Sequence, residues 1–162
     1  MDFTLEHLPA FAVIGKCGQG GFDDIPRWLL PLWEAANRDF AQIERLVKRN
    51  ERGQPVALWG AMSDRALRFA PWDADGGLYL AGCEALEDAQ PPEGWTRWDI
   101  PAQTYAVAAC TQADNSRVWA DMKERVLPRH GYRLAGASHE RYQPGVGAGE
   151  LRLYFPVQPL ET

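Results

Sequence analysis

The sequence is poor in the residues that build disulfide frameworks, metal sites and nucleophilic active sites. It holds only 3 Cys and 3 His in 162 residues. The histidines show no H-E-x-x-H or similar spacing, no Cys pair has zinc spacing, and no G-x-S-x-G occurs, so we expect no metal and no cofactor. The cysteines are far apart and odd in number, which is typical of small buried side chains in a reducing cytoplasm: Cys17, Cys83 and Cys110.

Long hydrophobic runs and an excess of basic residues are also missing. No stretch of about 18 uncharged apolar residues occurs, so no membrane span is predicted. The first six residues carry acid where a signal peptide needs base, so we expect a cytoplasmic protein. With 17 Lys+Arg against 22 Asp+Glu, the formal net charge is −5. This balance argues against direct binding of DNA, because phosphate contacts need clustered Lys and Arg.

What the chain does have is enough apolar material for one full core. Hydrophobic residues make up 46% of the sequence, and a chain of this length buries roughly 70% of its unfolded surface without metal or disulfide support. We therefore expect a single domain over residues 1–162. Aromatic residues are abundant, with 7 Trp, 5 Tyr and 6 Phe. Most should lie in the core, but large flat side chains also line cavities that hold flat ligands.

The first half of the chain predicts a strand, a helix and two strands. The apolar run 11–14 predicts the first strand, and Asp23-Asp24 before Pro26 predicts a helix start with proline in the first turn. Pro31 either kinks this helix or is its true first-turn residue. The apolar residues then continue at spacings of three and four. Two strands complete this half: 56–61 and 78–83.

The glycine-rich stretch 15–21 lies between the first strand and the helix. It lacks the Lys–Ser/Thr order of a phosphate-binding loop, and the predicted strand pairs are antiparallel, so a nucleotide site is not favoured. We interpret residues 18–21 as a flexible glycine turn.

The second half repeats the same order. Residues 105–109 predict a strand, and Asn115-Ser116 predicts the cap of a helix that ends by Pro128 and Gly131. Short sequence matches between the halves indicate a strand–helix–strand–strand unit used twice. Two such units would form an α+β fold, with an antiparallel sheet and two main helices around a ligand cleft. Two strands complete this half: 134–137 and 151–155.

Two carboxylates follow apolar segments, one in each half. Glu84 comes directly after the predicted strand 78–83, and Glu140 lies in the segment 138–142. Each is either a surface acid or an acid that points into an aromatic cavity. In a cavity, burial would raise the pKa of the carboxyl group unless a cation or hydrogen bonds compensate. A flat, lipophilic cation would provide that compensation, with cation–π contacts of about 0.5–2 kcal/mol each.

Six segments, in the same order along the chain, together resemble the GyrI-like family. These are small-molecule-binding domains that also occur as effector-binding domains of AraC-type and MerR-type multidrug-responsive transcription regulators. The resemblance implies two repeats related by pseudo-twofold symmetry. The segments that carry it are 25–34, 79–84, 100–107, 118–128, 139–142 and 153–157.

The resemblance also implies which residues form the ligand site. In this family a glutamate of a late E-x-Y motif receives cationic, lipophilic ligands at the base of an aromatic pocket, and here it matches Glu140, with Tyr142 on the same strand face. Glu84 matches the family's A-G-x-E segment and is a second candidate. Trp33 and Tyr154 are expected to wall the cavity. Two other matching aromatic residues are assigned to the core: Tyr105 and Trp119.

These implications leave three functions open. The first is a stand-alone binding module for cationic or amphipathic aromatic molecules, in drug sequestration or sensing. The resemblance begins within the first ten residues, so DNA contact is expected only through a separate protein partner. The second is a cofactor-independent hydrolase of cyclopropane-containing DNA-alkylating compounds, with Glu140 as general base and Tyr142 and Glu84 as helpers. The third is inhibition of DNA gyrase by protein–protein contact.

Overall fold

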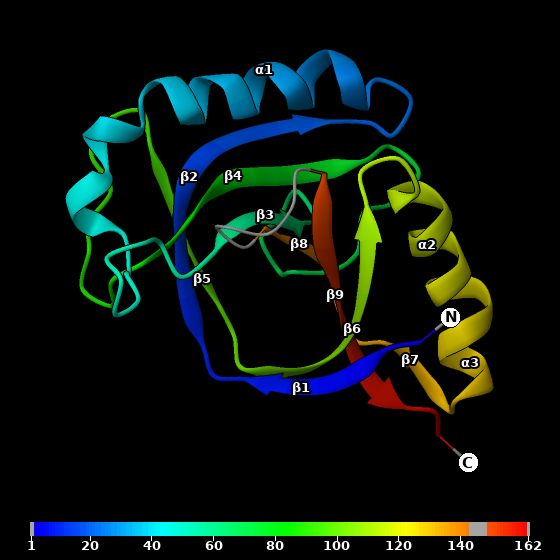
Figure 1. Cartoon of the computed structure of the whole chain (residues 1–162). Helices are drawn as coiled ribbons and strands as arrows, with labels where there is room; N and C mark the ends of the chain where they lie inside the picture. The colour runs from blue at the N-terminus through cyan, green and yellow to red at the C-terminus, as the bar shows by residue number, and fades with distance from the viewer. Residues whose placement is uncertain (1, 143–148, 162) are drawn as a thin grey trace.

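The computed structural model describes residues 2–142 and 149–161 of the chain. Over these ranges the strands form one 9-stranded antiparallel sheet in the order β1-β6-β9-β8-β3-β4-β2-β5, with β7 paired to β9 (Figure 1). This arrangement confirms the predicted α+β class with an antiparallel sheet. The strands are β1 (Thr4–Leu8), β2 (Phe11–Gly20), β3 (Leu58–Ser63), β4 (Gly77–Ala85), β5 (Thr96–Ile100), β6 (Gln103–Thr111), β7 (Tyr132–Leu134), β8 (His139–Tyr142) and β9 (Glu150–Pro159).

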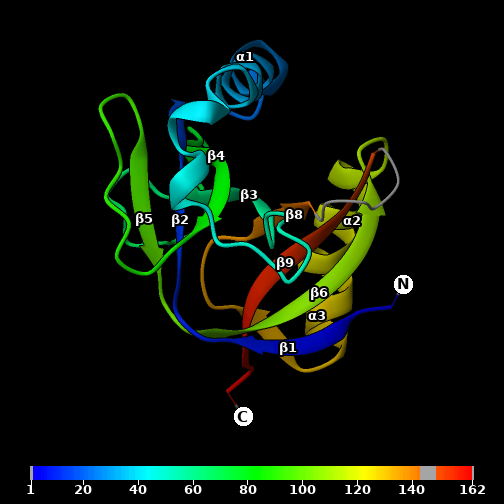
Figure 2. The ribbon, with the colours of Figure 1, turned by 60° about the vertical axis from the view of Figure 1, so that its left-hand side comes forward.

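Two helical segments lie over different parts of the curved sheet. The first, α1 (Ile25–Arg38), packs against β2 and β4. The second is the consecutive run of α2, η3 and α3 over residues 115–129, and it begins beside β6 (Figures 1 and 2). None of the helices in the described ranges has the length and apolar character needed to cross a bilayer. The remaining helical pieces are the 3-10 turns η1 (Phe40–Gln42) and η2 (Glu44–Leu46), then α2 (Asn115–Asp121), the π-helical turn η3 (Met122–Val126) and α3 (Leu127–Arg129).

The core lies on both faces of the sheet. Between the second helical segment and strands β6 and β9, Met122 and Leu127 pack against Phe155. On the opposite face, Trp59 and Tyr154 belong to a second buried cluster that is also rich in aromatic rings. Both faces of the central strands are therefore covered. This explains why the sequences of those strands are almost entirely apolar and do not alternate between apolar and polar residues.

The first helix begins where the sequence predicts. It starts at Ile25 with Pro26 in the first turn, and Pro31 lies inside the helix, so Pro31 is not its first-turn residue. The helix ends at Arg38. The apolar pattern continues beyond this residue, but there it lies in the 3-10 turns η1 and η2.

The predicted glycine turn at 18–21 is wrong for most of its length. Strand β2 continues to Gly20 and pairs with β4 throughout. A Cβ at Gly20 would overlap the indole ring of Trp28, and one at Gly18 would lie 3.0 Å from a methyl group of Leu32. These glycines therefore allow α1 to pack closely on the strand, which is a common reason for glycine inside a strand.

The predicted strand 134–137 is also wrong, apart from its first residue. Only Leu134 belongs to a strand, β7, whereas the strand that pairs with β3 is β8 at His139–Tyr142. The backbone N–H groups of Ala135 and Ala137 donate to the carbonyls of Pro156 and Phe69. Both partners come from other parts of the chain, so the local apolar pattern could not reveal them.

Candidate ligand-binding site

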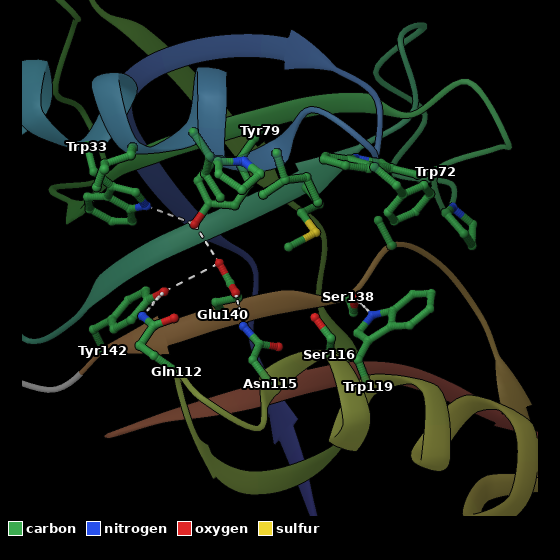
Figure 3. A pocket seen from close by; sticks show the side chains of 18 of the residues that line it. Trp33, Trp72, Tyr79, Gln112, Asn115, Ser116, Trp119, Ser138, Glu140 and Tyr142 are labelled. Atoms are coloured by element: carbon green, nitrogen blue, oxygen red, sulfur yellow. Dashed lines mark hydrogen bonds between the residues drawn. The ribbon is translucent and has the colours of Figure 1, made fainter. Parts of the chain in front are cut away.

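A cavity of about 600 Å³ lies on the helix-bearing face of the sheet. Its walls come from α1, from the start of α2 and from strands β3, β4 and β8, so segments far apart in the sequence meet there (Figure 3). The volume is within the range of small-molecule sites, which are typically concave and mostly apolar. The aromatic side chains that line it are Phe22, Trp33, Trp72, Tyr79, Trp119 and Tyr142.

The carboxylate of Glu140 lies at the centre of a hydrogen-bond network in this cavity (Figure 3). Its Oε1 accepts from the hydroxyl of Tyr79 at 2.6 Å and from that of Tyr142 at 3.4 Å, and its Oε2 accepts from Asn115 Nδ2 at 2.6 Å. The indole Nε1 of Trp33 donates to the Tyr79 hydroxyl at 3.0 Å. Every group that contacts the carboxylate in these bonds is a neutral donor.

Burial and hydrogen bonding act in opposite directions on this carboxyl group. Glu140 is 6% exposed, and desolvation raises its pKa above the ordinary value, while the bonds from Tyr79, Asn115 and Tyr142 lower it. Within residues 2–142 and 149–161, no lysine, arginine or histidine forms an ion pair with Glu140. The cavity therefore holds a carboxylate that lacks a positive partner from the described chain.

A glycine on β3, Gly60, makes this network possible. Strand β3 lies between β4 and β8, with Gly60 opposite Ala81 on one side and Glu140 on the other. A Cβ at Gly60 would overlap the Tyr79 hydroxyl and would lie 2.8 Å from Glu140 Oε1. Because Gly60 has no side chain, the tyrosine reaches across β3 to the carboxylate on β8.

The two residues that flank Glu140 on β8, His139 and Arg141, point to the other face of the sheet. Successive side chains of a strand alternate, and His139 and Arg141 lie against the ring of Trp59. Burial lowers the pKa of His139 to about 3, so its imidazole is uncharged near neutral pH. No group of three or more metal-liganding side chains is found in the part of the chain that the structure describes.

The structure brings three of the five predicted site residues together. Glu140, Tyr142 and Trp33 all line the cavity. Glu84 does not, because it accepts from the indole of Trp59 and pairs with Lys48 at 3.7 Å. Tyr154 is buried in the opposite aromatic cluster, where its hydroxyl accepts from Arg141. For both residues the strand alternation places the side chain on the face away from the cavity.

Sequence reasoning missed several residues of the cavity wall. Tyr79 and Asn115 contact the carboxylate directly, although the sequence indicated only a strand position for the first and a helix cap for the second. Trp119, assigned to the core, lines the cavity and donates to the Ser138 hydroxyl at 2.8 Å. The signal that could have revealed Tyr79 is Gly60, since a glycine inside an apolar strand often marks a close approach by another group.

The antiparallel fold with an aromatic-lined cavity defines an α+β domain of the small-molecule-binding class. The chain belongs to the GyrI-like family, described as the GyrI-like small molecule binding domain, which matches residues 1–158. This match confirms the resemblance stated from the sequence. No protein with a curated description matches the chain.

Solved structures with the same fold share little sequence with this chain. SAV2435, in its structure bound to tetraphenylphosphonium, is 15% identical with a TM-score of 0.67, over 98% of this chain and 94% of that one. The integron cassette protein VCH_CASS2 of Vibrio cholerae is 13% identical with a TM-score of 0.62, over 96% and 95%. EcmrR, in its complex with DNA, is 14% identical with a TM-score of 0.62, over 98% and 58%.

Proposed function

We propose that this domain binds cationic or amphipathic aromatic small molecules in the cavity, with Glu140 as the counter-ion of the ligand. The observation that carries the proposal is a carboxylate that is 6% exposed, bonded only by neutral donors and surrounded by aromatic rings. A buried anion without a cation is costly. An organic cation relieves this cost, and a small hydrated ion does so less well because it must lose its water.

The aromatic wall supports a flat or ring-bearing ligand. Trp33 and Tyr142 lie edge to face at a centroid distance of 5.5 Å beside the carboxylate. Ligand rings that enter the cavity would bury apolar area worth about 25 cal/mol per Å². Cation–π contacts would add about 0.5–2 kcal/mol each. In this proposal the carboxylate recognises the charge of the ligand, and the aromatic side chains beside it recognise the apolar surface of the ligand.

The tetraphenylphosphonium complex of SAV2435 supports the same class of ligand. That ion is a lipophilic cation with four phenyl rings, and the protein that holds it shares this fold at a TM-score of 0.67. We carry the ligand class to this chain as part of the proposal. The biological role that follows is sequestration or sensing of such compounds.

We also propose that the cavity lies between two repeats of one folding unit. Read outward from the β3–β8 pair, the strand order is β3-β4-β2-β5 in one direction and β8-β9-β6-β1 in the other. In each series the second strand follows the first along the chain, and a helical segment precedes the first strand. This correspondence supports the two-repeat interpretation of the sequence, with the ligand held where the repeats meet.

Replacing Glu140 by glutamine tests the electrostatic part of the proposal. The variant keeps the size of the side chain and removes its charge, so we expect tetraphenylphosphonium to bind at least about 10-fold more weakly. It loses a Coulomb attraction of about 3 kcal/mol, for a separation of roughly 5 Å at an effective dielectric constant of about 20. Neutral triphenylphosphine oxide should change by less than threefold. Isothermal titration calorimetry of both ligands at pH 7 measures the two effects.

Glu84→Gln is the matched control for that experiment. This residue is also a glutamate of low exposure that accepts a hydrogen bond from a neutral donor, the indole of Trp59, but it lies outside the cavity. Its replacement should leave the affinity for both ligands unchanged. An equal loss of both ligands in Glu140→Gln would contradict the counter-ion role.

A further inference from the structure

The polar N–H and O–H groups of five aromatic side chains in the cavity wall are bonded within the protein. The hydroxyl groups of Tyr79 and Tyr142 donate to Glu140. The indole N–H of each of three cavity tryptophans donates to a protein oxygen: Trp33 to the Tyr79 hydroxyl at 3.0 Å, Trp72 to the Leu78 carbonyl at 3.0 Å and Trp119 to the Ser138 hydroxyl at 2.8 Å. These aromatic side chains therefore offer a ligand their ring faces and not their N–H or O–H groups.

Two amide side chains extend this pattern. Asn115 Nδ2 donates to Glu140 Oε2 at 2.6 Å, and Gln112 Nε2 donates to the Tyr142 hydroxyl at 3.1 Å. Each bond directs the amide nitrogen toward its acceptor and leaves the amide oxygen on the other branch of the side chain, and both residues line the cavity (Figure 3). Neither amide oxygen accepts a hydrogen bond from any residue in the described ranges. One of these acceptors thus belongs to the amide that is bonded to the carboxylate, and the other to the amide that is bonded to Tyr142.

We propose that the site selects cations that carry N–H donors, such as protonated amines and amidinium groups, over fully substituted cations of similar size. This inference rests on the proposed function, because it concerns the ligand that Glu140 would hold. A ligand that enters the cavity displaces water from the amide oxygens. An N–H group replaces that water with a new hydrogen bond, whereas a quaternary ammonium group leaves the acceptors unpaired.

The two amides should contribute unequally. Asn115 is half-buried and its Nδ2 is bonded directly to the carboxylate, so its oxygen, on the same amide group, is the nearer of the two to the proposed counter-ion. Gln112 is exposed at the rim of the cavity. Water can satisfy the oxygen of Gln112 when the ligand does not, and the selectivity therefore depends mainly on Asn115.

The test compares two ligands with the same biphenyl body and the same charge. The first is 4-phenylbenzylammonium, with three N–H donors, and the second is 4-phenylbenzyltrimethylammonium, with none. We expect the wild-type domain to bind the first more tightly in calorimetry at pH 7. The readout is the ratio of the two dissociation constants, because Asn115→Ala also removes a donor to Glu140 and weakens both cations together.

Asn115→Ala should shift this ratio toward the trimethylammonium ligand by about 3–10-fold, the range for one lost hydrogen bond. Gln112→Ala should shift it by less than threefold, and Glu84→Gln should leave it unchanged. If Asn115→Ala does not fold, as judged by circular dichroism, Asn115→Leu provides the same comparison, because leucine is close to asparagine in size and carries no acceptor.

The possible failures are distinguishable. A ratio that Asn115→Ala leaves unchanged, or a wild-type domain that prefers the trimethylammonium ligand, overturns the N–H selectivity. If Glu140→Gln still weakens both ligands in that case, the proposed cation site stands. A wild-type domain that binds neither ligand nor tetraphenylphosphonium overturns both.

Discussion

His139 is an imidazole that the fold keeps uncharged. It is 1% exposed, its Nδ1 accepts the backbone N–H of Met62 at 3.0 Å, and burial lowers its pKa from 6.5 to about 3. Between these two pH values the unfolded chain binds more protons at this position than the folded one. The free energy of unfolding therefore falls as the pH is lowered through this window.

Replacing His139 by asparagine should remove this contribution. The asparagine oxygen can accept the Met62 N–H while carrying no titratable group. Between pH 6.5 and pH 3 we expect the variant to lose a slope of up to about 1.4 kcal/mol per pH unit from the pH dependence of its unfolding free energy. Urea denaturation over this range measures the slope, with exposed His7→Asn as the control. Identical slopes for wild type and His139→Asn would disprove the burial effect.

Strand β3 contributes one side chain, Met62, to the described cavity wall, but it determines how the residues of its two neighbouring strands meet. Its residue Gly60 gives the hydroxyl of Tyr79, on β4, a path to Glu140 on β8. The same strand sends Trp59 to the opposite face, into the second aromatic cluster. The alternation of β3 therefore separates the cavity from the core behind it.

Gly60→Ala should separate the tyrosine from the carboxylate. The added Cβ would overlap the Tyr79 hydroxyl, so we expect a loss of about 1–3 kcal/mol in stability, as for an overpacked core. The affinity for tetraphenylphosphonium should change as well, because Glu140 loses its shortest phenolic donor. Urea denaturation and calorimetry measure the two effects. Gly21→Ala is the control, since its Cβ would have no neighbour closer than 3.6 Å, and equal stability losses in both variants would contradict the role of Gly60.

At the scale of the whole molecule, the cavity exists only when distant parts of the chain come together. Trp33 and Tyr79 come from the first half of the chain, and Asn115 and Glu140 come from the second. The unfolded chain cannot hold these groups in one place. A ligand of the cavity should therefore bind the folded state alone and stabilise it by mass action.

Tetraphenylphosphonium at about 100 times its dissociation constant should raise the free energy of unfolding by about 2.7 kcal/mol. For a domain of this size that corresponds to a rise of roughly 5–11 °C in Tm. Differential scanning calorimetry of the wild type and of Glu140→Gln, at the same ligand concentration, measures the effect. If the Tm of the wild type does not rise at a ligand concentration that saturates it in direct titration, binding does not depend on the folded cavity.

The sequence by itself determined the class of fold, where the two main helices begin and which two acids are candidates for the cavity. The helix starts near Ile25 and Asn115 follow from local signals, namely proline in the first turn and polar residues before an apolar face. The common face of Glu140 and Tyr142 follows from their spacing along one strand. These features are local, so a single segment is enough to predict them.

Only the tertiary structure decided which residues surround Glu140. Glu84 and Glu140 looked equivalent as acids at apolar segments, but strand pairing places Glu84 beside Lys48 and away from the cavity. Tyr79 reaches the carboxylate across an intervening strand, at a separation of 61 residues. Sheet order and register together fix such contacts. The hydrophobic pattern of a strand constrains its register only once the neighbouring strand is known, and β3, β4 and β8 become neighbours only in the folded sheet.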